Sequence, residues 1–247
     1  MKRWYLAVLL PLLSTLSLAV QQTKPLTHGT WSKATWDVNR RWDFSDGTDM
    51  RPTRIASPDG HLVFHADPKP DSDPDSKGAP DYFVTRDGKR LEGEIEPEVD
   101  PEMAWSPDSK AFFITWSDGG AVGTFSVYVY LIDGGEVRKV DLDKPVRDDI
   151  ARTYPPCIPA DGIQSCSEEE KKAMVQDHDW VNVAGMKWMG GSDRLLVVGN
   201  VPDSSRYGAN MGKWLGYEIE VPSGKILKRY SRREFRSRWD YLKKDWD

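Results

Sequence analysis

The sequence predicts an all-β fold, a β-propeller-like array of four-stranded blades. Three observations predict this fold: a recurring phrase, a hairpin pattern that follows each copy in the chain, and the regular spacing of the copies. The phrase reads SPDGHLVF at residues 57–64 and SPDSKAFF at residues 106–113. Pro presets φ and Asp caps the turn, so each copy indicates two strands joined by a tight turn.

A fainter third copy covers residues 186–198, where Gly190-Gly191 replaces Pro-Asp. Behind each copy, apolar residues alternate about a Gly-bearing turn, at 82–95, 127–142 and 217–230. Such alternation is typical of a half-buried β-hairpin, so each unit has four short strands. Units at this spacing must stack on neighbours, because one blade cannot bury both of its faces alone.

The second copy, DPEMAWSPDSKAFFITWSDGGAVGTFSVYVYLIDGGEVRKVDL at residues 100–142, resembles the TolB-like, WD-type propeller repeat of bacterial exported proteins. The shared pattern is a Trp-Ser-Pro-Asp-Gly turn, an aliphatic-x-Phe strand, an aromatic strand and an Asp-x-x-Gly-Gly-like turn. The resemblance covers residues 50–142 and 183–230, and it implies a fold rather than an activity.

Three blades are readable, whereas a closed propeller needs about four or more. We expect residues 29–54, which are rich in Trp and strand formers, to supply a divergent fourth set of strands. The alternative is an open array with a covered edge.

The N-terminal segment predicts export. Lys2 and Arg3 precede an apolar run that carries no charge before Lys24, and Ser17-Leu18-Ala19 supplies a small-x-small cleavage pattern. We therefore expect a signal peptide over residues 1–19, a propeller-like domain over 20–230, and a periplasmic or secreted protein without stable membrane insertion. An uncleaved anchor is the alternative, although the run is slightly short for a span.

Charge and motifs exclude several functions. The formal net charge is −5, and it becomes −7 without Lys2 and Arg3, which argues against a nucleic-acid partner. No G-x-S-x-G, H-E-x-x-H or G-x-G-x-x-G motif occurs, and GANMGKW at 208–214 departs from a phosphate loop in spacing and in its last residue. We predict no cofactor.

Residues 143–182 interrupt the array as an insertion. It carries Cys157 and Cys166, which we expect to pair in an oxidising compartment and to contribute about 2–3 kcal/mol. Ser167 and Glu170 have the spacing of a capping box that opens a short helix.

Histidines and aspartates give weak metal candidates. On a strand, His61 and His65 would lie about 13 Å apart, too far to share an ion. His178 stands between Asp177 and Asp179 and could act as a base or a zinc ligand, although a solvated loop is the simpler interpretation.

A calcium loop is a further candidate. Asp71, Asp73 and Asp75 alternate as in its first half, but Ser76 and Tyr82 stand where Gly and Glu are needed.

Tryptophans could form a sugar-stacking face, or they could fill the space between blades, which is the more usual role of large aromatics. The residues concerned are Trp31, Trp36, Trp42, Trp105, Trp116, Trp180, Trp188 and Trp214.

The last segment, 231–247, predicts an amphipathic helix that begins at a Ser231–Glu234 capping box. Its apolar stripe is Phe235, Trp239, Leu242 and Trp246. We expect the stripe to cover an exposed strand edge of the same chain, with the basic residues facing acidic loops. The alternative is a surface in which these four residues bind a partner or an anionic membrane.

These observations favour an exported, non-catalytic binding or scaffolding module of the bacterial periplasm, with a protein or an envelope polymer as partner. Two alternatives stay open. One is an envelope-polymer or glycan hydrolase, which would need two carboxylates about 5–9 Å apart. The other is a carbohydrate-binding module that uses exposed Trp.

Overall fold

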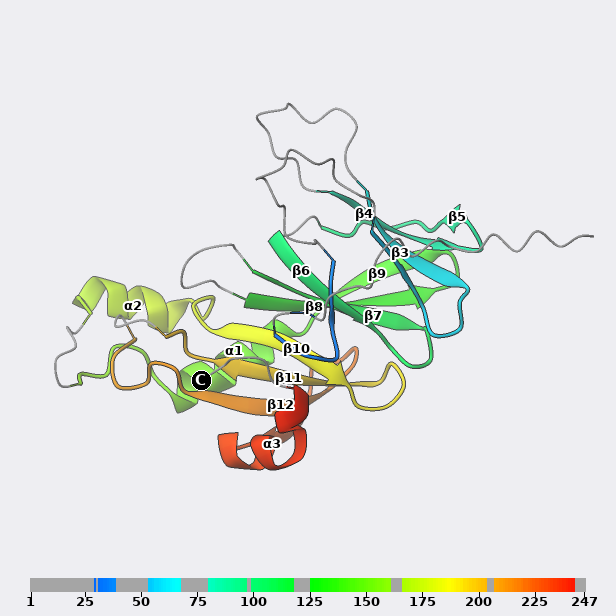
Figure 1. The fold of residues 1–247 in the computed structure, drawn as a ribbon. Helices are drawn as coiled ribbons and strands as arrows, with labels where there is room; N and C mark the ends of the chain where they lie inside the picture. The colour runs from blue at the N-terminus through cyan, green and yellow to red at the C-terminus, as the bar shows by residue number, and fades with distance from the viewer. Residues whose placement is uncertain are drawn as a thin grey trace, which may run out of the picture.

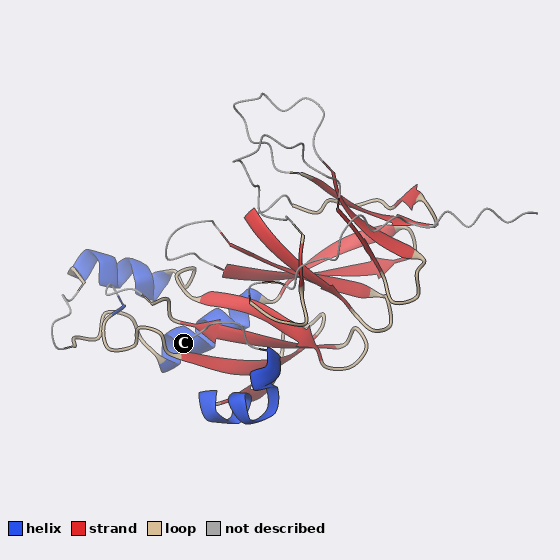
Figure 2. Cartoon of the chain, viewed as in Figure 1, coloured by secondary structure: helices blue, strands red, loops and turns tan. Residues whose placement is uncertain are grey.

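The computed structural model describes residues 29, 31–38, 53–67, 80–96, 99–117, 125–160, 166–203 and 207–242. Within these ranges the chain forms three antiparallel sheets, with helices at the sides and at one end (Figures 1 and 2). None of these sheets closes on itself in the described part of the chain. The predicted signal peptide lies outside the described residues.

The main strands of each sheet follow one another in chain order. The first sheet contains β2 (Thr53–Ala56), β3 (Leu62–Asp67), β4 (Asp81–Arg86) and β5 (Lys89–Arg90). The middle sheet contains β1 (Trp36–Asp37), β6 (Val99–Trp105), β7 (Ala111–Ser117), β8 (Phe125–Asp133) and β9 (Glu136–Asp141). The third contains β10 (Asn182–Trp188), β11 (Arg194–Asn200), β12 (Trp214–Glu220) and β13 (Ile226–Tyr230). The three readable units are therefore three sheets.

The recurring phrase forms the same hydrogen-bonded turn in the first two sheets. Ser57 Oγ donates to Asp59 Oδ1 (2.6 Å) and accepts the N–H of Leu62 (3.0 Å). Ser106 repeats the first contact by donating to Asp108 (2.7 Å). The repeat is thus a turn whose side chains satisfy its own backbone.

A second repeated contact joins neighbouring sheets. Trp105 Nε1 donates to the carbonyl of Ile55, and Trp188 Nε1 donates to the carbonyl of Ala104, each at 3.0 Å. Ile55 and Ala104 hold the same place, two residues ahead of the turn Ser. The position that corresponds to Trp105 in the first copy is Ala56, which has no indole N–H. The same hydrogen bond, from a Trp indole to a carbonyl of the preceding copy, therefore joins each pair of neighbouring sheets.

The turns themselves are also linked. The Asp59 N–H donates to Ser109 Oγ (3.1 Å), and Ser192 Oγ donates to Asp108 Oδ2 (3.0 Å). Gly190-Gly191 thus does not remove the third copy from the array, because the neighbouring Ser192 makes the contact between turns.

The middle sheet is buried on both faces. Phe112 and Ile114 of β7 pack towards the first sheet, in a cluster with Phe64. Phe113 packs on the other side, in a cluster with Val183 and further residues of the third sheet. Because side chains alternate along a strand, a run of buried residues on β7 requires a layer on each side.

The N-terminal segment corrects the expected fourth set of strands. In the described part of 29–54, β1 extends the middle sheet by pairing with β6 and forms no sheet of its own. The buried Glu102 of β6 accepts the N–H of Trp31 (2.9 Å) and the hydroxyl of Thr35 (2.7 Å). Ser32 donates to the carbonyl of Met186 in the third sheet (2.8 Å). The segment therefore straps two sheets together.

The insertion contains two helices. The predicted helix is confirmed as α2 (Glu168–Gln176), and both hydrogen bonds of its capping box are present. The sequence did not predict α1 (Asp143–Thr153), whose N-cap is Leu142, without a side-chain cap. Its apolar residues Val146 and Ile150 press against Gly199, where a Cβ would meet them at 2.6 and 2.8 Å.

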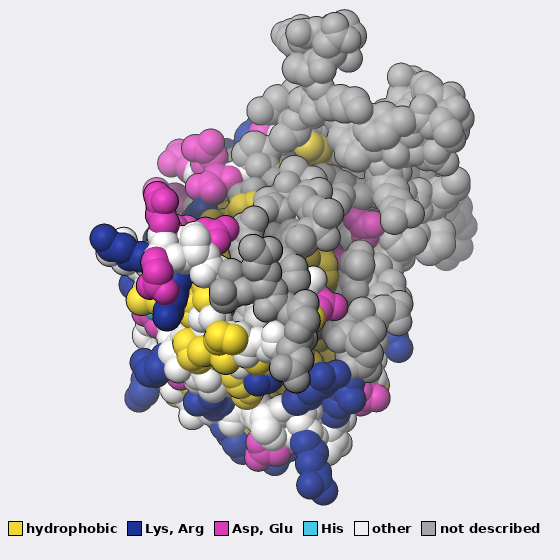
Figure 3. Space-filling view, turned by 90° about the vertical axis from the view of Figure 1, so that its left-hand side faces the viewer, with side chains coloured by type: hydrophobic (Ala, Val, Ile, Leu, Met, Phe, Trp, Pro, Cys, Tyr) yellow, Lys and Arg dark blue, Asp and Glu magenta, His cyan; other side chains and the backbone are white. Residues whose placement is uncertain are grey.

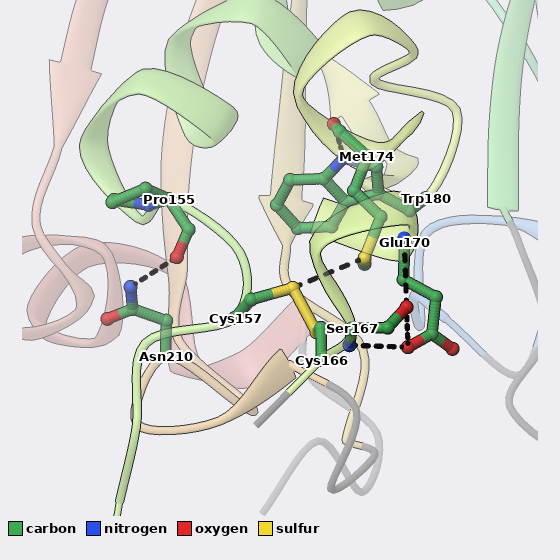
Figure 4. Close-up of a disulfide and its surroundings, with 8 residues drawn as sticks. All are labelled: Pro155, Cys157, Cys166, Ser167, Glu170, Met174, Trp180 and Asn210. Atoms are coloured by element: carbon green, nitrogen blue, oxygen red, sulfur yellow. Dashed lines mark hydrogen bonds between the residues drawn. A yellow bond between two sulfur atoms is a disulfide. The ribbon is translucent and has the colours of Figure 1, made fainter. Parts of the chain in front are cut away.

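The predicted disulfide between Cys157 and Cys166 is present in the segment between these helices (Figure 4). Met174 Sδ lies 3.7 Å from Cys157 Sγ, and Trp180 Nε1 donates to the Met174 carbonyl (2.8 Å). The bridge is in keeping with a non-cytoplasmic, oxidising compartment. In the described ranges, no helix has the length and apolar character needed to cross a bilayer.

The C-terminal helix α3 (Arg232–Trp239) continues into η2 (Asp240–Leu242). Its residues Phe235, Trp239 and Leu242 are buried on the outer face of the third sheet, and Phe235 sits over Gly216, where a Cβ would lie 2.3 Å from the ring. The expectation of a covered strand edge is wrong, because the helix covers a face. Trp246 lies outside the described residues.

The basic side chains of α3 were expected to face acidic loops. Arg232 instead lies over the ring of Trp214 (5.6 Å to its centroid), and Arg238 lies over the ring of Tyr230 (5.5 Å). Both rings belong to the sheet beneath, so these guanidinium groups line the seam between helix and sheet.

We predict that Phe235→Ala lowers the free energy of unfolding by about 3–5 kcal/mol, because a cavity would open over Gly216. Arg233→Ala, at an exposed position on the same helix, should change it by less than about 0.5 kcal/mol. Urea unfolding followed by tryptophan fluorescence measures both values. Equal stability of the two variants would contradict docking of α3 on the sheet.

Candidate functional site

A cavity of about 640 Å³ lies where the insertion meets the middle sheet. Its walls come from β7, β8 and the end of β9, from α1, and from the end of α2 with the segment that follows it. The lining comprises Trp116, Ser126, Tyr128, Asp141, Asp143, Lys144, Arg147, Asp148, Gln176, Asp177, His178 and Asp179. This polar hollow is the candidate site.

Arg147 of α1 builds the inner wall. The residue is 7% exposed, and Nη1 donates to the carbonyls of Asp179 (2.7 Å) and Val181. Nη2 donates to Ser126 Oγ (2.6 Å) and Asp143 Oδ2 (3.0 Å). One side chain thereby joins α1, the start of β8 and the chain entering β10. Arg suits this role because its donors form a rigid, planar fork.

Asp143 is the buried partner of Arg147. It is 5% exposed, and its Oδ1 accepts the N–H of Val127 (2.9 Å). Burial raises the pKa of this carboxyl to about 6, against the opposing effects of the Arg147 charge and the Val127 N–H. Both oxygens of Asp143 are engaged by the protein, so this group holds the wall and is badly placed to protonate a substrate.

The hypothesis that His178 acts together with Asp177 and Asp179 is not supported, because His178 contacts a carboxylate of another element. Its Nδ1 lies 2.8 Å from Asp148 Oδ1 on α1, and Lys144 Nζ donates to Asp148 Oδ2 (2.9 Å). The hydrogen bond from Lys144, and then that from His178, hold the pKa of Asp148 below its usual value. A zinc site is not formed, since the described residues contain no group of three or more potential ligands.

Three further carboxylates stand at the rim. Asp141 ends β9 and accepts the N–H of Asp143 (2.8 Å), and Asp177 accepts the N–H of Asp179 (3.0 Å). Asp141, Asp177 and Asp179 are exposed, and none has a cation within ion-pair distance among the residues described. The cavity therefore has an excess of negative charge.

Aromatic rings complete the wall on the sheet side. Trp116 and Tyr128 stack with centroids 6.2 Å apart. Lys139 Nζ lies 3.5 Å from the centroid of Tyr128 and also pairs with Glu96 (2.6 Å). A cation thus already rests on part of this aromatic surface.

A smaller hollow of about 470 Å³ lies on the other side of the Asp148–His178 pair. Pro155, Pro156 and Met174 give it a largely apolar lining between α1 and the disulfide segment. Figure 3 looks at the end of the molecule that carries α2; acidic side chains gather towards its upper left and basic ones towards its lower rim.

Of the other sequence candidates that the structure describes, His61 and His65 do not line the cavity. Asp71, Asp73 and Asp75 lie outside the described residues, as does Trp42. His61 is exposed beside Asp87 (3.1 Å), whereas His65 is half-buried on Phe83. Of the seven described tryptophans in the proposed sugar-stacking set, Trp188 and Trp214 are buried and the other five are partly buried, which favours packing over a sugar-stacking face. Trp116 alone of these lines the cavity.

Sequence reasoning singled out His178, Asp177 and Asp179 but missed Arg147, Asp143 and Asp148. The signal was present in the i, i+4 spacing of Asp143 and Arg147, and of Lys144 and Asp148. Comparison with protein-family models, curated proteins and solved structures gives no match for the chain.

We predict that Arg147→Met lowers the free energy of unfolding by about 3–5 kcal/mol at pH 7, because it leaves the Asp143 carboxylate buried without its partner. Arg152→Met is the control, since the Arg152 side chain is 73% exposed and its pair with Asp149 should contribute less than about 1 kcal/mol. Chemical denaturation measures both. A loss of stability no larger for Arg147→Met than for Arg152→Met would contradict a stabilising role of the buried Arg147–Asp143 pair.

Asp143 predicts a pH dependence. Its folded pKa, about 6, exceeds the unfolded value of 3.8, so its protonation favours the folded state. This stabilisation is complete below about pH 4 and is lost as the pH rises through 6. We expect the stability of the wild type relative to Asp143→Asn to fall by on the order of 2–3 kcal/mol between pH 4 and pH 7. A difference that rises with pH would show that the ion pair outweighs burial.

Proposed function

We propose that the chain is an exported, non-catalytic binding module of the bacterial periplasm, and that its ligand occupies the cavity beside α1. The observation that carries this proposal is a hollow of about 640 Å³ with polar and aromatic walls on a hydrogen-bonded frame. A well-formed concave site with converging polar groups is the usual place for a small ligand, or for one protruding side chain of a larger one.

The non-catalytic part is supported by the state of the carboxylates. A glycan hydrolase needs a protonated carboxyl free to reach the leaving oxygen. Asp143 has the raised pKa of such an acid, yet Arg147 and the Val127 N–H occupy its oxygens. Asp148 is held at a lowered pKa by Lys144 and His178. The arrangement suits recognition better than proton transfer.

The propeller-like architecture and the export belong to the same proposal. The repeated Trp-to-carbonyl contacts and the strand order of each sheet support stacked, blade-like units, and the TolB-like type is proposed from the sequence resemblance. The predicted signal peptide and the Cys157–Cys166 bridge support an oxidising location.

A thermal-shift screen of small cationic, anionic and sugar ligands tests the proposal. A ligand at a hundredfold excess over its Kd should raise Tm by roughly 5–10 °C. Gln176→Trp, at the rim, should abolish the shift, whereas Ala173→Trp on the exposed face of α2 should keep it. No hit from any class, or a hit that Gln176→Trp leaves intact, would reject the cavity as the site. Turnover of a bound glycan would reject the non-catalytic assignment.

A further inference from the structure

We infer that the cavity takes a small organic cation, a ligand with one or more ammonium or guanidinium groups; this inference rests on the proposed function and names its ligand class. It depends on the hollow, on the balance of charge inside it and on its aromatic wall.

The charges inside the cavity do not cancel. Arg147 is matched by Asp143 at 3.0 Å, and Lys144 is matched by Asp148 at 2.9 Å. These two pairs use both Lys and Arg side chains of the lining, and His178 also contacts Asp148. The remaining carboxylates, Asp141, Asp177 and Asp179, form no ion pair with a described residue. An anionic ligand would be repelled, while a cation would complete the balance.

The carboxylates of Asp177 and Asp141 and the backbone of Asp179 are also held in place. Asp177 accepts the N–H of Asp179, and the Asp179 carbonyl accepts a hydrogen bond from Arg147 at 2.7 Å. Asp141 stands at the end of a sheet strand and is tied to the N–H of Asp143. Preorganised carboxylates lose little entropy when they receive a donor, which favours binding.

The aromatic wall distinguishes an organic cation from a metal ion. Trp116, which stacks on Tyr128, brings ring surface into the cavity that attracts ammonium and guanidinium groups and also covers their attached carbon chains. Lys139, resting on Tyr128 at 3.5 Å, makes this type of contact within the protein itself. A hard divalent ion would instead need several oxygens converging on one point.

Isothermal titration of the full chain with spermidine, L-arginine amide, succinate and cellobiose tests the inference at low and high salt. We expect a cationic probe to bind and succinate not to bind, with affinity falling as salt rises. Asp177→Asn/Asp179→Asn should weaken binding by about ten- to hundredfold or more, since hydrogen bonds to charged groups are lost. Asn keeps the Oδ1 acceptor of Asp177, so the local turn is preserved.

The matched control is Asp133→Asn/Glu136→Gln, which removes the same charge from the exposed β8–β9 turn, away from the cavity lining. It should bind the cationic probe within twofold of the wild type. Equal weakening by both doubles would indicate a general surface field and overturn the inference. Binding of succinate or cellobiose that Gln176→Trp blocks would also overturn it and leave the proposed function standing. If no probe binds in the titration or the screen, both fail.

Discussion

Burial of the middle sheet on both faces is the constraint on which the rest of the structure depends. Phe112 and Phe113, neighbours on β7, point into different clusters, so the first and third sheets must lie on opposite sides of the second. The Trp105 and Trp188 contacts then fix how far each sheet steps from the one before. The third sheet is left with an apolar outer face, and α3 covers it.

The insertion adds polar interactions that hold the sheets together. Arg147 joins α1 to the middle sheet and to the strand that enters the third sheet, so the cavity stands where two sheets and a helix are held by one guanidinium group. A hollow could collapse if its wall were only apolar. Here the directional hydrogen bonds of a buried ion pair keep the carboxylate rim at a defined place.

Much of the fold could be predicted from local patterns, because a Ser-Pro-Asp turn and strict alternation each need only a few neighbouring residues. The capping boxes at Ser167 and Ser231 predict their helices for the same reason. The site is different. Asp141, Asp148 and His178 come from separate elements, and only the packing of α1 brings them together. The position of residues 31–38 could not be predicted from local patterns either, because it depends on Glu102, which lies about seventy positions away in the sequence.

The repeated step from a Trp to the carbonyl of the preceding copy gives the array a direction. The second and third copies each donate an indole N–H to a carbonyl of the copy before, whereas Ala56, at the matching position of the first copy, has no indole to donate. The contact between neighbouring sheets therefore has a donor side and an acceptor side that are chemically unlike. The module carrying Trp105 has both a donor for the sheet before it and, in Ala104, an acceptor for the sheet after it. It is therefore the natural unit of growth, because a duplicate placed beside it would meet matching surfaces on each side.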